Sequence, residues 1–428
     1  MLLRYTKSYT KIIATFFLVI IMGLSIASCE QTISQSSTVQ ENTNNTPIVF
    51  NKTIPPHYST ISYNNNIFAL KLFEQLEKNN TNVFFSPFSI YDALTIAYEG
   101  AKGKSAEEMH FLLGIPNNDK TTESQFSEVL SDLKGNPNYQ LKIANAIWPK
   151  IGLVINKSYK ERIEKYFHST VQNVDLGSND GTNIIEQWIK NHTNNKISIN
   201  IKPDPLMDMV ITNAIYFKGS WANRFDKSLT KKQDFYVTPK KTIKVDMMHF
   251  SESHKLKYAN RSKYEALDLP YKGSNLSMLI ILPNKPYGID DINISSINIA
   301  DLESVMHKNN VIVDLPKFSY RSYYLLNKAL KNMGMISAFY PKTANFSGSF
   351  GNFAKDIYIG KVLHDAYVNV TEQGTEAAAV TVITQGTTAA PPREVSINHP
   401  FLFFIIDNNT NLILFMGKVV EPTGTLVS

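Results

Sequence analysis

The chain has 428 residues, of which 43% are hydrophobic and 19% charged, so it can bury a large core and is neither fibrous nor intrinsically disordered. Its formal net charge of +6 falls to +3 without residues 1–28, which hold three basic groups and no acidic one (6 − 3 = 3). So mild a charge excludes nucleic acid as an expected partner.

The first residues have the pattern of an export signal. A basic start precedes an apolar run of 15 residues from Ile12 to Ile26, which is too short for a comfortable membrane span. Ala27 and Ser28 then precede Cys29, the single cysteine of the chain. This ending resembles a bacterial lipoprotein signal, so we expect cleavage before Cys29 and a lipid on its sulfur. The alternative is an ordinary signal peptide that ends beside a free cysteine.

A polar stretch follows the signal. Residues 30–57 are rich in Ser, Thr, Asn and Gln and end in Pro55-Pro56, which is typical of a flexible tether. We therefore expect a signal peptide over 1–28, a lipid-anchored tether over 29–57 and a folded domain over 58–428. The domain would be exported, held on the cell envelope through Cys29, and free of thiols and disulfides. Glu30, and not Asp, follows the cysteine, which favours the outer membrane if the cell has two membranes.

Helices are predicted mainly in the first part of the domain and strands mainly in the second. The predicted helices are 67–76, 87–98, 106–113, 123–133, 156–167 and 183–192, and the predicted strands are 209–217, 242–248, 264–269, 276–282, 311–315, 366–370, 401–407 and 413–420. Ser105 and Glu108 have the spacing of a capping box, and Gly114 is placed to end that helix. This order predicts an α+β domain with a large, mainly antiparallel sheet.

No pattern typical of an enzyme is present. The chain has no GxSxG, HExxH or CxxC sequence and no glycine-rich phosphate-binding motif, and its nine histidines lack the spacing of metal ligands. A Ser-His-Asp site assembled from distant positions would escape such a search. We expect no catalytic residue, no metal and no cofactor.

A basic stretch over residues 227–244 carries six lysines: Lys227, Lys231, Lys232, Lys240, Lys241 and Lys244. It would suit a polyanion. However, Thr238-Pro239 lies between two strand-like runs, which favours an ordinary hairpin with solvated lysines. Both interpretations stay open.

Six blocks of sequence resemble the serpins. They are "NVFFSPFSIYDALTIAYEGAKGKSAEEM" (82–109), "ITNAIYFKGSWANRF" (211–225), "MMHF" (247–250), "LPKFSYRSYYLLNKALKNMGM" (315–335), "EQGTEAAAVT" (372–381) and "NHPFLFFIIDNNTNLILFMGKVVEP" (398–422). The resemblance implies the serpin fold, with N-terminal helices, a large mainly antiparallel sheet, smaller sheets and an exposed reactive-centre loop at about 372–394. It also implies a monomeric proteinase inhibitor and no enzyme activity. A proteinase would cleave the loop and be trapped as an acyl-enzyme while the loop enters the main sheet.

The residues of this loop suit insertion. The resemblance assigns its hinge to Glu372, Gly374, Thr375, Glu376, Ala377, Ala378, Ala379, Val380 and Thr381. With the period of a strand, Thr375, Ala377 and Ala379 share one face, and all three are small and uncharged, as in inhibitory members. Val380 departs from the usual Ala, and we expect slower insertion at most. Without the resemblance, a permanent strand and a proline-terminated loop would explain the same letters.

Two counts locate the scissile bond and differ by one residue. Counting forward from the hinge gives Thr388–Ala389, and counting back from Glu394 gives Ala389–Ala390. We favour Thr388–Ala389, because the distance from the hinge determines how much of the loop can insert. Both offer a small neutral residue, which predicts elastase-like or subtilisin-like serine proteinases as targets and leaves papain-like cysteine proteinases open. The alternative function is a non-inhibitory serpin that acts as a surface binding or carrier module.

Two further groups of residues are assigned by the resemblance. Ser86, Ser89, Asn213 and His364 match the shutter, the hydrogen-bonded cluster where the central strands separate. Ser86 also suits an N-cap before Pro87. Trp221 matches the breach, the top of the sheet where insertion begins, although it would also serve as a core residue.

Overall fold

The structure is a computed structural model that describes residues 60–78, 81–115, 119–351, 356–375, 391–423 and 426–427. The chain divides into residues 1–46 and 47–428, and every described residue belongs to the second part. The predicted signal peptide, Cys29 and the tether lie outside the described residues. No helix in the described ranges is long and apolar enough to cross a membrane.

Each of the six predicted helices is present; helix 87–98 has the predicted ends, and the other five differ at one or both ends. The longer helices are α2 (Thr60–Leu76), α3 (Pro87–Tyr98), α4 (Gly103–Leu113), α5 (Asp119–Lys134), α6 (Lys157–Tyr166) and α7 (Asn179–His192). The shorter ones are η1 (Ile289–Asp291), η2 (Ile294–Ser296), α8 (Ile299–Val305), α9 (Asn327–Asn332), η3 (Ser337–Phe339) and α10 (Ser347–Phe350). As predicted, Gly114 ends α4 in the left-handed conformation, with a φ of 62°.

The predicted capping box at the start of α4 is wrong. The helix already begins at Gly103, two residues before Ser105, and it has no side-chain cap. The Ser105 hydroxyl instead accepts a hydrogen bond from the backbone N–H of Asn345 (3.1 Å), and the Glu108 carboxylate accepts one from that of Ser337 (2.6 Å). Tertiary partners therefore occupy both side chains, which the local spacing does not reveal.

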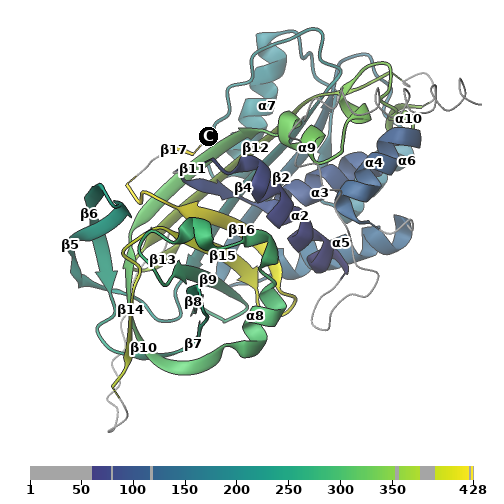
Figure 1. Ribbon diagram of the computed structural model, residues 1–428. Coiled ribbons are helices and arrows are strands. Elements are labelled where there is room, and N and C mark those ends of the chain that lie inside the picture. Colours follow the sequence, from purple (N-terminus) through teal and green to yellow (C-terminus); the bar gives the residue numbers. More distant parts are fainter. Residues whose placement is uncertain are drawn as a thin grey trace, which may run out of the picture. The chain divides into compact units, whose positions relative to one another are not determined.

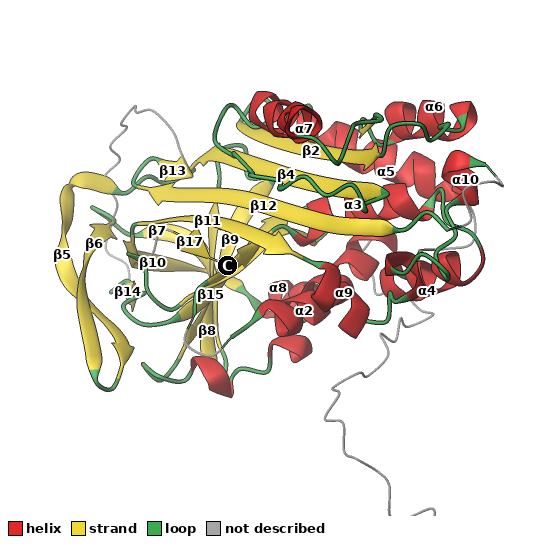
Figure 2. Ribbon diagram, turned by 90° about the horizontal axis from the view of Figure 1, so that it is seen from above, coloured by secondary structure: helices red, strands yellow, loops and turns green. Residues whose placement is uncertain are grey.

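A seven-stranded sheet forms one layer of the domain (Figures 1 and 2). Its order is β17 (Leu426–Val427), β11 (Phe318–Leu325), β12 (Ile359–Thr371), β13 (Gly374–Thr375), β4 (Met209–Ser220), β2 (Tyr139–Pro149) and β3 (Thr170–Val171). Figure 2 shows β11, β12, β4 and β2 side by side, with α7 next to β2. Pairs β11–β12 and β2–β4 are antiparallel, whereas β12 and β4 are parallel.

A ten-stranded sheet forms a second layer. It contains β1 (Val83–Phe85), β16 (Leu412–Val419), β15 (Phe401–Asp407), β9 (Leu276–Pro283), β8 (Tyr264–Pro270), β7 (His254–Asn260), β10 (His307–Pro316), β6 (Lys241–His249) and β5 (Asp226–Thr238) in that order, and β14 (Arg393–Ser396) pairs with β10. Strands β5 and β6 form the predicted hairpin. Three of its lysines are in ion pairs, Lys232 with Asp246, Lys241 with Glu421 and Lys244 with Asp234, at 2.5–3.1 Å.

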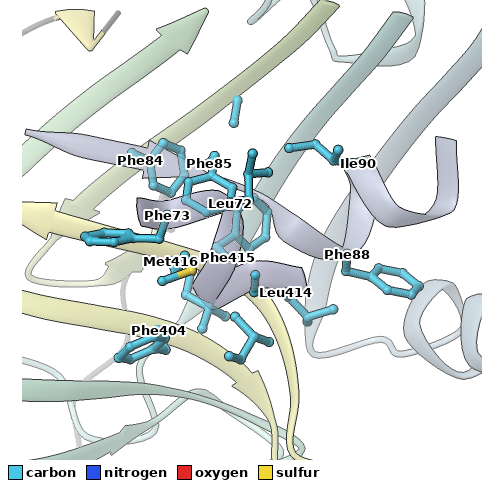
Figure 3. Close-up of a cluster of buried hydrophobic side chains, with 14 of the residues drawn as sticks. Leu72, Phe73, Phe84, Phe85, Phe88, Ile90, Phe404, Leu414, Phe415 and Met416 are labelled. Atoms are coloured by element: carbon cyan, nitrogen blue, oxygen red, sulfur yellow. The ribbon is translucent and has the colours of Figure 1, made fainter. Parts of the chain in front are cut away.

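The main core lies against one face of the seven-stranded sheet. Figure 3 shows Phe84 and Phe85 of β1 beside Phe415 and Met416 of β16 and Leu72 of α2. The rings of Phe84 and Phe415 stack with their centroids 5.8 Å apart. A smaller core covers the opposite face of this sheet, where Ile185 of α7 and the following segment 197–201 pack over Trp148 and Leu363. Strand β4, at the centre of this sheet, is thus buried on both faces along most of its length.

Candidate functional site

The two central strands of the seven-stranded sheet separate at one end. Strands β12 and β4 pair directly from Ile359 and Met209 to Tyr367 and Tyr216. Beyond that point β13 lies between them, antiparallel to both. Gly374 and Thr375 make up this short strand, which pairs with Thr371 and Val370 of β12 and with Ser220 and Gly219 of β4.

Gly374 occupies a position that excludes a side chain. Its φ is +139°, a conformation that L-residues rarely adopt. A Cβ atom there would lie 2.1 Å from the carbonyl oxygen of Gly219 and 2.8 Å from the backbone nitrogen of Trp221. Because backbone atoms cannot move aside cheaply, only glycine allows the chain to enter the sheet at this point.

Thr375 is fully buried, with 0% of its surface exposed. Its hydroxyl lies 2.9 Å from the hydroxyl of Tyr271. Burial raises the pKa of Tyr271, so the phenol stays protonated and both groups share one hydrogen bond. A small side chain with one hydroxyl therefore fits this buried position and has a hydrogen-bond partner there.

Trp221 lies at the end of the sheet where β12 and β4 separate. It is 2% exposed, and its ring stacks on Tyr271 with centroids 4.6 Å apart. Its indole N–H donates to the carbonyl of Thr371 (2.9 Å), and its backbone N–H donates to that of Gln373 (3.0 Å). The side chain is thus a core residue that also holds the turn between β12 and β13.

Glu372 anchors the same turn. Its carboxylate, 3% exposed, lies 3.1 Å from the ammonium of Lys317 and accepts a hydrogen bond from Thr230 (2.9 Å). Burial alone would raise the pKa of Glu372. Hydrogen bonds from its own backbone, Thr230 and Lys317, together with the lysine charge, outweigh burial and lower the pKa below its ordinary value.

Ser86, Ser89, Asn213 and His364, which the sequence assigns to the shutter, lie together in the structure. The backbone N–H of Ser86 donates to Nε2 of His364 (3.1 Å), and the Asn213 amide donates to the carbonyl of Ser89 (2.9 Å). His364 and Asn213 are directly opposite in the β12–β4 register and are hydrogen-bonded through Nδ1 and Oδ1. Ser86 also caps α3 and accepts from the N–H of Ser89 (3.3 Å).

The hydrogen bonds determine the tautomer of His364. Since Nε2 accepts from a backbone N–H, the proton lies on Nδ1 and is donated to Asn213. Burial lowers the pKa of His364 to about 3, so the imidazole is neutral at physiological pH. The contact between β12 and β4 at this level is therefore a hydrogen bond between neutral groups.

Two residues that the sequence did not reveal extend this cluster. Asn145 of β2 accepts a hydrogen bond from the Asn213 amide and donates to Asp92 of α3 (2.7 Å). Asp92 is 1% exposed, and burial raises its pKa to about 7, although Lys134 and Asn145 act in the opposite direction. The one sequence feature that could have indicated this extension is the acidic residue Asp92 within the mainly apolar helix 87–98.

Arg321 forms an ion pair on the face of the seven-stranded sheet that lies opposite the main core. Its guanidinium binds both carboxylate oxygens of Asp365 (2.8–3.2 Å) and also donates to the carbonyl of Ser198, in the segment between α7 and β4. Asp365 is 0% exposed. We call this group the Arg321 clasp. It joins β11, β12 and the segment that covers the smaller core.

The described residues contain no group of three His, Cys, Asp or Glu side chains placed to hold a metal ion. They do contain a carboxylate–imidazole pair, Asp314 with Nδ1 of His249. Nε2 of that histidine lies 2.9 Å from the amide nitrogen of Gln233, where a hydrolase would require a nucleophile. This pair therefore lacks the third member of a catalytic triad.

Several predicted site residues lie outside the described part of the chain. They are Glu376 to Thr381 of the hinge, both candidate scissile bonds at Thr388, Ala389 and Ala390, and Cys29. Their assignments remain predictions.

Comparisons with known proteins agree over the whole domain. Residues 63–422 match the family model of the serpins (serine protease inhibitors). The chain is 38% identical over 369 residues to an uncharacterized serpin-like protein of Thermococcus kodakarensis, which covers 83% of this chain and 84% of that protein. The native thermophilic serpin tengpin superposes with a TM-score of 0.77 at 28% identity, covering 87% and 96% of the two chains. Human thyroxine-binding globulin in complex with thyroxine gives a TM-score of 0.77 at 27% identity, covering 86% and 100%.

Proposed function

The chain belongs to the serpin family, and from that membership we propose that it is an inhibitory serpin. A target proteinase cleaves the loop at Thr388–Ala389 or Ala389–Ala390, and the segment that follows Gly374 inserts between β12 and β4 while the enzyme remains attached as an acyl ester. The observation that carries this proposal is β13. Two residues of the predicted hinge already pair with both neighbouring strands, in the antiparallel direction that further insertion requires.

The register of β13 supports the proposal because it can be extended. Thr375 pairs with Val370 and Gly219. Moving six residues forward in the loop (375 to 381) and six back in each strand (370 to 364, 219 to 213) sets Thr381 between His364 and Asn213. Those two residues also face each other in the β12–β4 register, so the two neighbours give the same alignment.

This alignment explains the chemistry expected of the shutter. Insertion up to Thr381 separates His364 from Asn213 and breaks the hydrogen bond between them. The threonine hydroxyl can donate and accept, so it replaces the lost partner of both side chains. Insertion there exchanges one neutral hydrogen bond for others and leaves no charge unpaired.

The same alignment suits the faces of the inserted strand. Thr375 faces the main core, so Ala377, Ala379 and Thr381 would follow on that face. Glu376 falls on the opposite face beside Lys218 of β4, which is partly exposed. The one acidic residue of the inserted segment thus meets a cation near solvent.

Small residues at both candidate scissile bonds support elastase-like or subtilisin-like serine proteinases as targets, with papain-like cysteine proteinases as a further class. The test is to mix the domain with such a proteinase and examine the products on a denaturing gel. We expect a covalent adduct of the summed mass, and none with the same proteinase whose catalytic serine is replaced by alanine. Cleavage of the loop without any adduct would contradict inhibition and favour the non-inhibitory binding or carrier alternative. Mass spectrometry of the released peptide would assign the bond.

We also propose that the protein is anchored by a lipid at Cys29, on the outer membrane or cell surface. The basic start, the apolar run 12–26 and the small residues before Cys29 support this. Replacing Cys29 by Ala should move the expressed protein from the membrane fraction to the soluble exported fraction. A variant that stays in the membrane fraction would overturn the assignment.

A further inference from the structure

A hollow of about 710 Å³ lies where the described chain resumes at Pro391, beyond the loop. Three strands form it. β10 pairs antiparallel with β7 and parallel with β14, and Figure 1 shows their labels together at one end of the ten-stranded sheet. Lys255, Lys308 and Arg393, one from each strand, are among the residues that line this hollow.

The lysines of β7 and β10 lie close together, and the repulsion between their charges lowers the stability of the domain. Lys308 is directly opposite Lys257 in the β7–β10 register, and Lys255 lies two residues away on the same face, opposite Asn310. Like charges directly opposite each other destabilise a pair of strands. Glu303 forms an ion pair with Lys257. Lys255 and Lys308 are exposed, and within the described ranges no carboxylate lies within ion-pair distance of either.

Arg393 points to the other face of the ten-stranded sheet, because it pairs with Val311, whereas Lys255 pairs with the neighbouring Asn310. Its guanidinium lies over the ring of Tyr258, 4.8 Å from the centroid, and 3.6 Å from the Glu265 carboxylate. The Tyr258 hydroxyl donates to the same carboxylate (2.8 Å), which holds the group together. Glu394 is the single acidic side chain among the residues that line the hollow.

We infer that this hollow is a docking surface for the acidic rim of the proteinase that attacks the loop. The inference rests on the proposed inhibitory function. A proteinase bound at Thr388–Ala389 or Ala389–Ala390 is only a few residues from Pro391, and an extended chain spans about 3.5 Å per residue. Its surface on the leaving side of the scissile bond therefore lies within about 10 to 15 Å of the hollow. Complementary charge there accelerates association more than it strengthens the final complex.

The test compares rates of adduct formation for a charge-reversed double variant, K255E with K308E. The probes are a subtilisin and its variant with glutamates introduced along the rim on the leaving side of the cleft. We expect the charge reversal to lower the second-order rate constant with the glutamate-bearing subtilisin by about tenfold at low salt, and to change it little at high salt. The rate constant with the parent subtilisin should change less than about twofold.

A matched control carries the same change of net charge elsewhere. Lys102 and Lys342 are exposed; Lys102 directly precedes α4, and Lys342 lies between η3 and α10. Helices α4 and α10 lie at the other end of the domain from β10 in both views (Figures 1 and 2). The variant K102E with K342E should keep the rate constant of the parent within about twofold, because its charges lie beyond the screening length. An equal loss in this control, or no loss in K255E with K308E, would overturn the inference.

Three other results would each decide between the proposals. If the reversal abolishes retention on immobilised heparin but leaves both rate constants unchanged, the hollow binds a polyanion and the inference is wrong. If no form of the domain yields an adduct with either subtilisin, with an elastase or with a papain-like proteinase, the proposed inhibitory function fails, and this inference fails with it. Adducts formed at rates that do not depend on Lys255 and Lys308 would leave inhibition intact and refute only the docking surface.

Discussion

Gly374 and Thr375 place the start of the loop between β12 and β4, the first because it has no side chain and the second because its side chain fills a buried site. Gly374 has room for no side chain, because the carbonyl of Gly219 occupies the place of its Cβ. Thr375 fills a closed site and finds a partner in Tyr271. The residues that begin insertion are therefore specified by contact distances and burial, and substitutions here test the mechanism most sharply.

Replacing Thr375 by Arg should convert the inhibitor into a substrate. A guanidinium in this fully buried site has no anionic partner, and burying an unpaired charge costs several kcal/mol. We expect the yield of covalent adduct to fall at least about tenfold while cleavage of the loop persists. Thr375→Ser, which keeps the hydroxyl, is the control and should retain the yield. An unchanged yield for Thr375→Arg would refute the role of this residue.

Asp92 makes the stability of the native domain depend on pH. Burial raises its pKa from 3.8 to about 7, so the native state binds this proton more tightly than the unfolded chain does. Its protonation favours the native state below the folded pKa, and this contribution is lost as the pH rises through about 7.

Asp92→Asn should remove that dependence. An amide keeps the acceptor for Asn145 and carries no charge. We expect the variant to be more stable than the parent by up to about 4 kcal/mol at about pH 8, and by much less at about pH 4.5. Denaturant unfolding at both pH values measures the difference. An equal difference at the two values would show that Asp92 does not titrate in this range.

The Arg321 clasp acts on elements, because it joins β11 and β12 to the segment that follows α7. In the extended register, Val380 falls beside Asp365 on the face that the clasp covers. The segment around Ser198 packs over Ala214 of β4 and Leu363 of β12, so we expect it to move when these strands part. We therefore expect the clasp to slow insertion in the uncleaved domain.

Arg321→Lys tests this role. Lysine keeps the charge but cannot hold Asp365 and the Ser198 carbonyl at once, since it lacks the planar fork of arginine. We expect adduct-forming activity to decay about tenfold faster on warm incubation, which corresponds to losing one charge-assisted hydrogen bond. Arg261→Lys, the same change at an exposed turn, should decay like the parent. Equal decay of Arg321→Lys and the parent would exclude the clasp from the barrier.

At this scale the sequence predicts the strongly patterned elements and misses the others. The buried runs 276–282 and 401–407 are almost wholly apolar, and both form strands of the ten-stranded sheet. Strand β2 was missed because Lys142 and Asn145 interrupt its pattern, although Asn145 is buried and hydrogen-bonded in the cluster around Asn213. The capping box failed for the same reason, since tertiary partners decide what a polar side chain binds.

The candidate site was predictable in part. The family resemblance located Ser86, Asn213 and His364, and the structure brings them together. Asp92 and the clasp could not be located, because each depends on a partner more than 40 residues away in the chain. The parallel pairing of β12 and β4 likewise connects segments about 150 residues apart, which no local pattern encodes.

For the whole molecule, insertion changes how the seven-stranded sheet is held together. The parallel β12–β4 pair gives way to two antiparallel pairs, and parallel pairing is slightly less stable per residue. Each backbone hydrogen bond contributes about 1 kcal/mol net, so a full new strand stabilises the domain by roughly 10 kcal/mol. The uncleaved domain is therefore expected to be metastable, with β13 as the start of the more stable arrangement.

The thermal unfolding of the loop-cleaved domain, compared with that of the intact domain, tests this account most directly. Cleavage within residues 376–390 should free the segment to insert, and we predict that the cleaved domain melts well above the intact one. Thr375→Arg, cleaved in the same way, should show a much smaller rise. Equal melting temperatures for the cleaved and intact parent would mean that no strand is held in reserve, and would contradict the account.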